Sequence, residues 1–175
     1  MKTAKLLVYF VYHQEGGIVL ELRKIAVDSL SLPEILSLLE IARGLSQMRP
    51  DWNQLKGELA RYDAWGFYEN QELFGYALVN PSSAYFGGSV QLAALRYSWQ
   101  YNRESVIGQM ICRLAGAYRE ASELMVMDID IRHDLNLGLY KKLGFSNSLM
   151  RSPLDRDHAV LVSGLDSLLK NRFDT

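Results

Sequence analysis

The sequence predicts a single α/β domain, and three observations lead to that prediction. β-prone apolar runs alternate with amphipathic helical patterns along the chain, which is typical of a sheet covered by helices. A chain of 175 residues has the size of one ordinary domain. No repeat, low-complexity stretch or linker divides it, so residues 1–175 are expected to share one core.

Composition excludes several classes of protein. Apolar residues make up 49%, charged residues 22% and aromatic residues 11% of the chain, as in a soluble globular domain. The formal net charge of −1 gives no positive field for nucleic acid or membrane surfaces, so we expect neither as a partner. Cys112 is the single cysteine, which excludes an intramolecular disulfide and favours a reducing, cytoplasmic compartment.

The first segment is expected to be an N-terminal extension strand within residues 1–16. Its apolar run, Leu6–Tyr12, is too short for a signal peptide and has no small-residue cleavage site after it. Gly16 and Gly17 separate this run from a second β-prone segment, Ile18–Val27. A Gly-Gly pair between two such segments predicts a hairpin turn.

Two helices are expected next. Ser31 is a candidate N-cap with Glu34 three residues later, the spacing of a capping box, and Gly44 provides a stop. The second helix is expected from Asp51 to Arg61, with apolar residues at three- and four-residue spacings.

The rest of the chain alternates between strands and helices. The patterns predict strands at 64–69, 73–79, 89–99, 124–131 and 159–162, and helices at 104–121, 134–143 and 165–170. The run Leu124–Ile131 is too apolar for a strand with one face in water, so it is expected in the centre of the sheet.

The segment Asn136–Phe145 resembles the signature helix of the GCN5-related N-acetyltransferase (GNAT) family, in which Leu-Tyr-x-Lys-x-Gly-Phe follows a hydrophobic strand. In that family the tyrosine protonates the departing coenzyme A thiolate, and Tyr140 stands at its place. A phenol with an ordinary pKa near ~10 is protonated at neutral pH, so it can donate. The alternative is a short helix that merely packs on a sheet. Many relatives have Asn seven residues before the tyrosine and Ala four residues before it, where this chain has His133 and Asn136.

A second segment is similar to the family's pyrophosphate loop. The pattern of that loop is Arg or Gln, then any two residues, then Gly, then any one residue, then Gly or Ala. In this chain the segment reads Arg103-Glu104-Ser105-Val106-Ile107-Gly108. Free backbone N–H groups at a helix start bind phosphate, and glycine allows close approach. Val106 replaces the first glycine, and its side chain is expected to crowd a phosphate or to make a positive φ costly. Glu104 adds a negative charge beside the anion.

Together these resemblances imply a mixed, mostly antiparallel sheet with helices on both faces, and acetyl-CoA as co-substrate. The strand around Leu95 is expected to splay from the strand around Val126–Asp130, and main-chain groups near Leu95 and Tyr97 are expected to bind the pantetheine arm. The acceptor would be a small-molecule or peptide amine. The alternative is a GNAT-fold binding or regulatory module that has lost acetyl-CoA binding.

The acceptor side carries few signals. Asp128 and Asp130 are candidates for a base or for a cation site, or else they lie at a solvated sheet end. Trp65, Tyr68 and Tyr85 could line an acceptor pocket or belong to the core. The three histidines are scattered and no Cys-x-x-Cys exists, so no metal site is expected. A homodimer is expected only as the common state of soluble enzymes.

Overall fold

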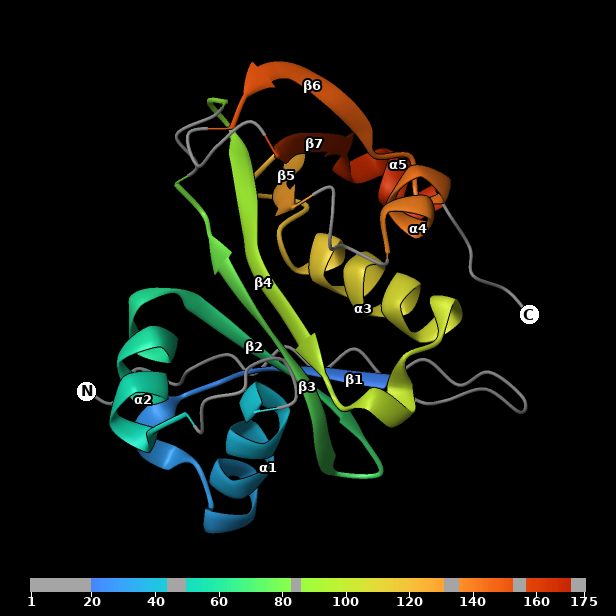
Figure 1. Ribbon diagram of the computed structural model, residues 1–175. Helices are drawn as coiled ribbons and strands as arrows, with labels where there is room; N and C mark the ends of the chain where they lie inside the picture. The colour runs from blue at the N-terminus through green and yellow to red at the C-terminus, as the bar shows by residue number, and fades with distance from the viewer. Residues whose placement is uncertain (1–19, 44–49, 83–85, 131–135, 153–156, 171–175) are drawn as a thin grey trace.

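The computed structural model describes residues 20–43, 50–82, 86–130, 136–152 and 157–170. Their strands form one sheet in the order β1-β2-β3-β4-β5-β7-β6 (Figure 1). Neighbouring strands pair antiparallel except β4 and β5, which are parallel. The mixed, mostly antiparallel sheet is therefore confirmed. The predicted extension strand, residues 1–16, lies outside the described residues.

The first half of the described chain supplies four strands and two helices. Their bounds are β1 Leu20–Lys24, α1 Leu32–Arg43, α2 Trp52–Arg61, β2 Asp63–Glu69, β3 Glu72–Asn80 and β4 Ser89–Tyr97. Half of the predicted capping box is present, because the Ser31 backbone N–H donates to the Glu34 carboxylate at 2.9 Å, while the Ser31 hydroxyl also donates to that carboxylate, at 2.6 Å, rather than accepting from the Glu34 N–H. Asn70 and Gln71 both have positive φ, as a tight two-residue hairpin turn between β2 and β3 requires.

The second half supplies the crossover and the end of the sheet. Its elements are α3 Glu104–Ala117, β5 Leu124–Asp130, α4 Leu137–Lys142, β6 Ser146–Arg151, β7 His158–Gly164 and α5 Leu165–Lys170. Short 3₁₀ turns occupy Val27–Ser29 and Trp99–Tyr101. The helix α3 connects the parallel strands β4 and β5, as parallel pairing requires.

The helices cover both faces of the sheet, as expected. One core lies between the sheet and α3, α4 and α5, and is centred on residues such as Met110, Leu114 and Met127. The other lies under α1 and α2, where Leu38 and Leu59 pack on Tyr76. Figure 1 shows α1 and α2 on one side of β4 and α3 with α4 on the other. Strands β2, β3 and β4 send side chains into both cores, whereas β5 and β7 contribute to the first core only.

Several predicted boundaries were wrong. Strand β4 ends at Tyr97 rather than at 99, because a 3₁₀ turn follows it. Helix α3 ends at Ala117, where Tyr118 leaves helical geometry with φ −112° and ψ 4°. Strand β6 was not predicted, since Ser146-Asn147-Ser148 lacks β-prone residues and the strand pairs with β7 at its two ends only. The predicted end of the strand at residue 131 and the predicted start of the helix at residue 134 lie outside the described residues.

Candidate active site

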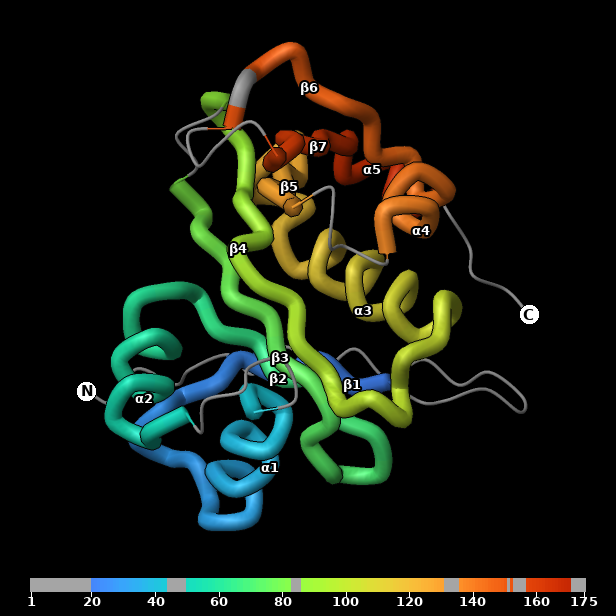
Figure 2. The backbone as a smooth tube through the Cα atoms, in the orientation of Figure 1, coloured from blue at the N-terminus to red at the C-terminus, as the bar shows by residue number. Residues whose placement is uncertain are grey.

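The centre of the candidate site is a fork between β4 and β5. The two strands pair from Ser89–Leu124 to Leu92–Met127, and the pairing ends there. The pairing of β4 with β3 skips Ala93, a bulge of the kind that bends a strand. Figure 2 shows the two backbones side by side at the start of β4 and then apart. The predicted splay is thus present, and it begins near Ala93.

Beyond the fork, β4 turns an unpaired edge toward the gap. Leu92 is buried, whereas the residues from Ala93 to Tyr97 are all at least partly exposed. The side chains of Leu95 and Tyr97 pack against the α3 core, and both line a cleft of about 1160 Å³. Among the described residues, β5 does not pair with this half of β4, so the strand edge beside Leu95 faces the gap between the two strands.

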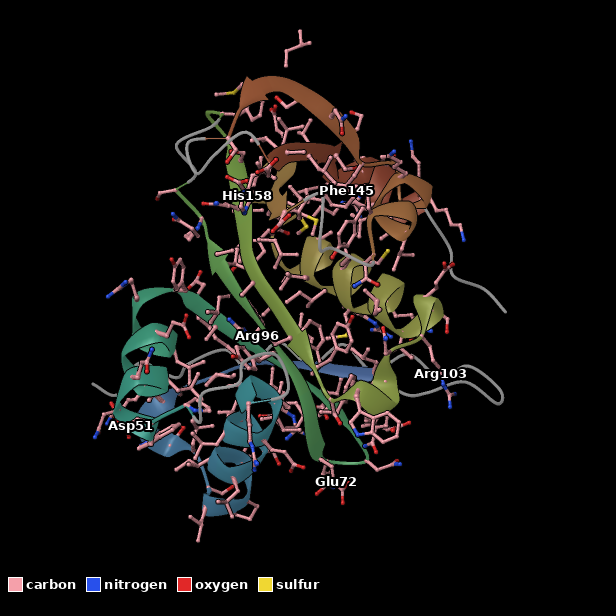
Figure 3. The ribbon with its side chains drawn as sticks, in the orientation of Figure 1. Asp51, Glu72, Arg96, Arg103, Phe145 and His158 are labelled. Atoms are coloured by element: carbon pink, nitrogen blue, oxygen red, sulfur yellow. The ribbon has the colours of Figure 1, made fainter. Side chains whose placement is uncertain are left out.

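The start of α3 lies at the same end of the sheet as this cleft. Arg103 is the N-cap with extended geometry, and its side chain forms no capping hydrogen bond. The first intrahelical bond runs from the Ile107 N–H to the Arg103 carbonyl at 3.0 Å. The N–H groups of Glu104, Ser105 and Val106 thus have no partner within the helix. Figure 3 shows Arg103 on the outer surface, beside this helix start.

The expected obstruction by Val106 is wrong. Its side chain is 2% exposed and packs in the core with Ile107 and Met110, so it points away from the helix start. Among described residues only Asn70 and Gln71 combine a side chain with positive φ, so the backbone at Val106 is unstrained. Gly108 is buried within the same helix. The position that holds the family's first glycine serves the core here.

The negative charge of Glu104 is compensated. The Lys142 ammonium of α4 lies 2.7 Å from the Glu104 carboxylate, and both side chains are exposed. This ion pair links the first turn of α3 to the last turn of α4. A phosphate at the start of α3 would therefore approach a nearly neutral pair and the exposed Arg103.

Tyr140 lies on α4, opposite the free edge of β4. Its side chain is 4% exposed, makes an edge contact with Phe145, and lines the same cleft as Leu95 and Tyr97. Asn136, the residue before α4, donates from Nδ2 to the Tyr97 hydroxyl at 3.0 Å, which connects the two walls of the cleft. The structure therefore brings Tyr140, Leu95 and Tyr97 together on one cavity. His133 lies outside the described residues.

An aromatic clamp at the cleft rim was not predicted. Tyr101 stacks on Phe74 with ring centroids 4.1 Å apart and donates to the Glu69 carboxylate at 2.6 Å. This hydrogen bond, with lesser contributions from burial and the charge of Glu69, raises the pKa of Tyr101 to about 12. The clamp ties the turn after β4 to the β2–β3 hairpin. The repeated aromatics at Tyr97, Trp99 and Tyr101 were the available signal.

A polar network supports the other end of the cleft. Glu34 lines the cleft and accepts hydrogen bonds from Ser31 and, at 2.9 Å, from Tyr68. Burial opposes ionisation of Glu34, but these bonds and the Arg23 charge outweigh it and lower its pKa below the ordinary value. Arg23 lies over the Tyr68 ring at 4.5 Å. Glu34 and Tyr68 thus hold α1 on β2.

The remaining candidates divide by face. Asp128 and Asp130 are half-buried and point away from α3, because they alternate with the core residues Met127 and Ile129. Ser152 donates to Asp128 at 2.8 Å. Tyr68 is buried in the core, and the Trp65 indole donates to Tyr118 at 2.8 Å; Tyr85 is outside the described residues.

Neither metal ligands nor membrane segments stand out in the described ranges. They contain no group of three or more His, Cys, Asp or Glu side chains placed to hold a metal ion. Within the same residues, no helix has the length and apolarity needed to cross a membrane.

Comparison with solved structures identifies the fold. The PaiA N-acetyltransferase of Thermoplasma acidophilum, solved with coenzyme A, matches at a TM-score of 0.63 and 13% identity over 84% of this chain and 99% of its own. The Salmonella typhimurium protein YncA, a putative acetyltransferase solved with acetyl-CoA, matches at a TM-score of 0.60 and 16% identity over 84% of this chain and 94% of its own. A GNAT-family acetyltransferase of Bacillus cereus matches at a TM-score of 0.61 and 12% identity over 82% of this chain and 94% of its own.

No family model matches the chain, and no curated protein matches it. At identities of 10–16% the structural matches establish the fold. The chain therefore has the GNAT fold, and the residues of its cleft have to be interpreted from their own geometry.

Proposed function

We propose that this protein is an N-acetyltransferase that moves an acetyl group from acetyl-CoA to a primary amine. One observation carries the proposal: Leu95 and Tyr97, on the part of β4 that β5 no longer pairs with, line one cleft with Tyr140 and with Asn102, which directly precedes Arg103, the N-cap of α3. An elongated ligand with a phosphate end and a reactive end fits this arrangement.

The main-chain edge of β4 would bind the pantetheine arm near Leu95 and Tyr97, as an added strand binds a sheet edge. The amides of Glu104, Ser105 and Val106, with the helix dipole and Arg103, would hold the pyrophosphate, and Ile107 and Gly108 continue that turn into the core. In this proposal the thioester lies toward the fork at Ala93.

In the transfer step the amine nitrogen bonds to the acetyl carbon and the carbon–sulfur bond breaks. Tyr140 gives its hydroxyl proton to the departing thiolate sulfur, which leaves as the thiol. Asp128 is the first β5 residue beyond the last pair with β4, so its carboxylate is placed to receive the proton that the amine loses. The Tyr140 phenolate then regains a proton from solvent, and Asp128 releases the proton that it received.

Activity tests this proposal directly. The purified protein is incubated with acetyl-CoA and a panel of amines that includes polyamines, amino acids, peptide N-termini and lysine peptides, and thiol release is measured. We expect amine-dependent thiol release with at least one class. Thiol release that stays at the rate of the protein-free mixture across the panel, with acetyl-CoA binding absent, would contradict the proposal.

The phosphate end can be tested by removing a single N–H group. Arg103 has φ −124° and ψ 136°, which suits a residue before proline, and Glu104 is the first helical position, where proline is tolerated. Glu104→Pro removes the N–H and the charge, whereas Glu104→Ala removes the charge only. We expect Glu104→Pro to bind acetyl-CoA about tenfold or more weakly than Glu104→Ala, because a hydrogen bond to a charged group is lost. Equal affinities would place the pyrophosphate elsewhere.

The alternative, a GNAT-fold module without acetyl-CoA binding, was suggested by the departures at Val106 and Glu104. The buried Val106 side chain and the Glu104–Lys142 ion pair remove two of its reasons. Asn136 takes part in the wall of the cleft. These observations support the enzyme over the module.

A further inference from the structure

We propose that the acceptor carries a carboxylate, and that Arg96 together with Tyr76 binds it on the α1/α2 side of the fork. This inference rests on the proposed N-acetyltransferase function and names the class of its acceptor. The acceptor class is an amino acid or a closely related amine with a free carboxylate.

The partly exposed Arg96 and the buried Tyr76 form a polar pair. They are direct cross-strand partners of β4 and β3, so their Cβ atoms are neighbours. Tyr76 is fully buried against α1 and α2, and Arg96 shares the face of Ala94, which packs on the same core. Figure 3 shows Arg96 on the side of β4 that faces these two helices. The pair thus lies opposite the face where Leu95 and Tyr97 line the cleft.

Both members lack hydrogen-bond partners at buried atoms. The Tyr76 hydroxyl and the Arg96 Nε are buried without a partner, and Arg96 forms no ion pair among described residues. A buried donor left unsatisfied destabilises a fold, and an arginine cannot relieve the cost by losing its proton. Two such donors side by side fit a ligand that brings acceptor oxygens.

The local charges favour a singly charged ligand. The guanidinium contributes one positive charge and the phenol none, because burial raises the pKa of Tyr76 to about 12 despite the opposing effect of Arg96. Glu58 of α2 lies near enough to add to that increase, and it forms no ion pair with Arg96 among the described residues. Its negative charge disfavours a doubly charged phosphate, whereas the planar donor fork of Arg96 suits a carboxylate.

The fork sets the distance to the reacting amine. Asp128 on β5 faces away from α3 as Arg96 does, so opposite charges stand on the two arms of the fork on one face of the sheet. Ala93 and Arg96 are roughly 10 Å apart along the strand. An arginine side chain and a small amino acid can bridge that distance together. The ammonium end would then meet Asp128 and the carboxylate end Arg96.

The test compares each of the twenty amino acids with its own carboxamide as acceptor, with acetyl-CoA and thiol release as the readout. We expect the native protein to favour at least one acid over its amide by tenfold or more in kcat/KM. Arg96→Gln should bring that ratio to within threefold of one, and Tyr76→Phe should lower it. The matched control Arg119→Gln, a distant exposed arginine, should keep it.

Further variants distinguish a role of Arg96 in acceptor binding from a role in stability alone. Arg96→Lys retains the charge without the planar fork, so it should recover part of the preference even if Arg96→Gln is poorly folded. If Arg96 served only to stabilise α2 through Glu58, Glu58→Gln and Arg96→Gln would change thermal stability alike and leave the preference intact, which would overturn the inference. Acetylation without carboxylate preference, or no acetylation of any amino acid although acetyl-CoA binds, would also overturn it while the proposed function stands. Absence of acetyl-CoA binding would contradict both this inference and the proposed function.

Discussion

Replacing Val106 by glycine restores the residue that the related loops carry, and we expect it to harm stability without improving acetyl-CoA binding. The valine side chain is 2% exposed within the α3 core. Burial of a valine side chain contributes about 1.5–3 kcal/mol, and the remaining cavity and the added backbone freedom bring the expected loss to about 2–4 kcal/mol.

For a chain of this size such a loss lowers Tm by about 5–15 °C, since 1 kcal/mol corresponds to about 2–4 °C. Thermal unfolding followed by circular dichroism measures it, and calorimetric titration at a temperature where both proteins are folded measures acetyl-CoA affinity. Val106→Ala, which keeps a Cβ, should lose about half as much stability. A glycine variant that kept its Tm and bound acetyl-CoA ten times more tightly would show that the valine does obstruct the loop.

Three further predictions follow from contacts in and around the cleft. Tyr140→Phe should lower kcat by about 100-fold or more while acetyl-CoA affinity changes less than threefold, because only the proton donor is lost; an unchanged kcat measured by thiol release would exclude that role. The Glu34 carboxyl has a lower pKa in the folded state, so its stabilisation is present above its unfolded pKa and is lost as pH falls through the folded value. The difference in the free energy of unfolding between the native protein and Glu34→Gln, measured by urea unfolding, should therefore be constant above about pH 5.5 and decrease below about pH 4.5. A difference that does not depend on pH would contradict this prediction. Lys142→Gln should weaken acetyl-CoA binding about threefold to tenfold at low salt, less at 0.5 M salt, because the Glu104 charge loses its partner, while stability changes by less than about 1 kcal/mol; equal weakening at both salt concentrations would point to a packing effect.

Local sequence signals predicted most of the fold. The bond from the Ser31 N–H to Glu34 at the start of α1, the start of α2 after Asp51 and the hairpin between β2 and β3 appear at the predicted residues. These features depend on contacts within a few residues, which a sequence displays directly. Strand β6 was missed because its residues have little β propensity, and only its position beside β7 makes it a strand.

The site was less predictable, since its key properties come from tertiary packing. The family resemblance pointed to Tyr140 and the start of α3 as site candidates, but the sequence could not show that Val106 points into the core or that Lys142 reaches Glu104 across two helices. The pairing of Arg96 with Tyr76 depends on the β3–β4 register, and the bulge at Ala93 shifts that register by one residue. Alternation along β4 taken by itself does not reveal this contact.

The central claim is that the cleft lined by Leu95, Tyr97 and Tyr140, together with the start of α3, binds acetyl-CoA, and calorimetric titration of the native protein with acetyl-CoA tests it most directly. We predict a single site with micromolar affinity. No detectable heat and no displacement of a fluorescent CoA analogue at millimolar acetyl-CoA would contradict the claim and favour a GNAT-fold module with another ligand.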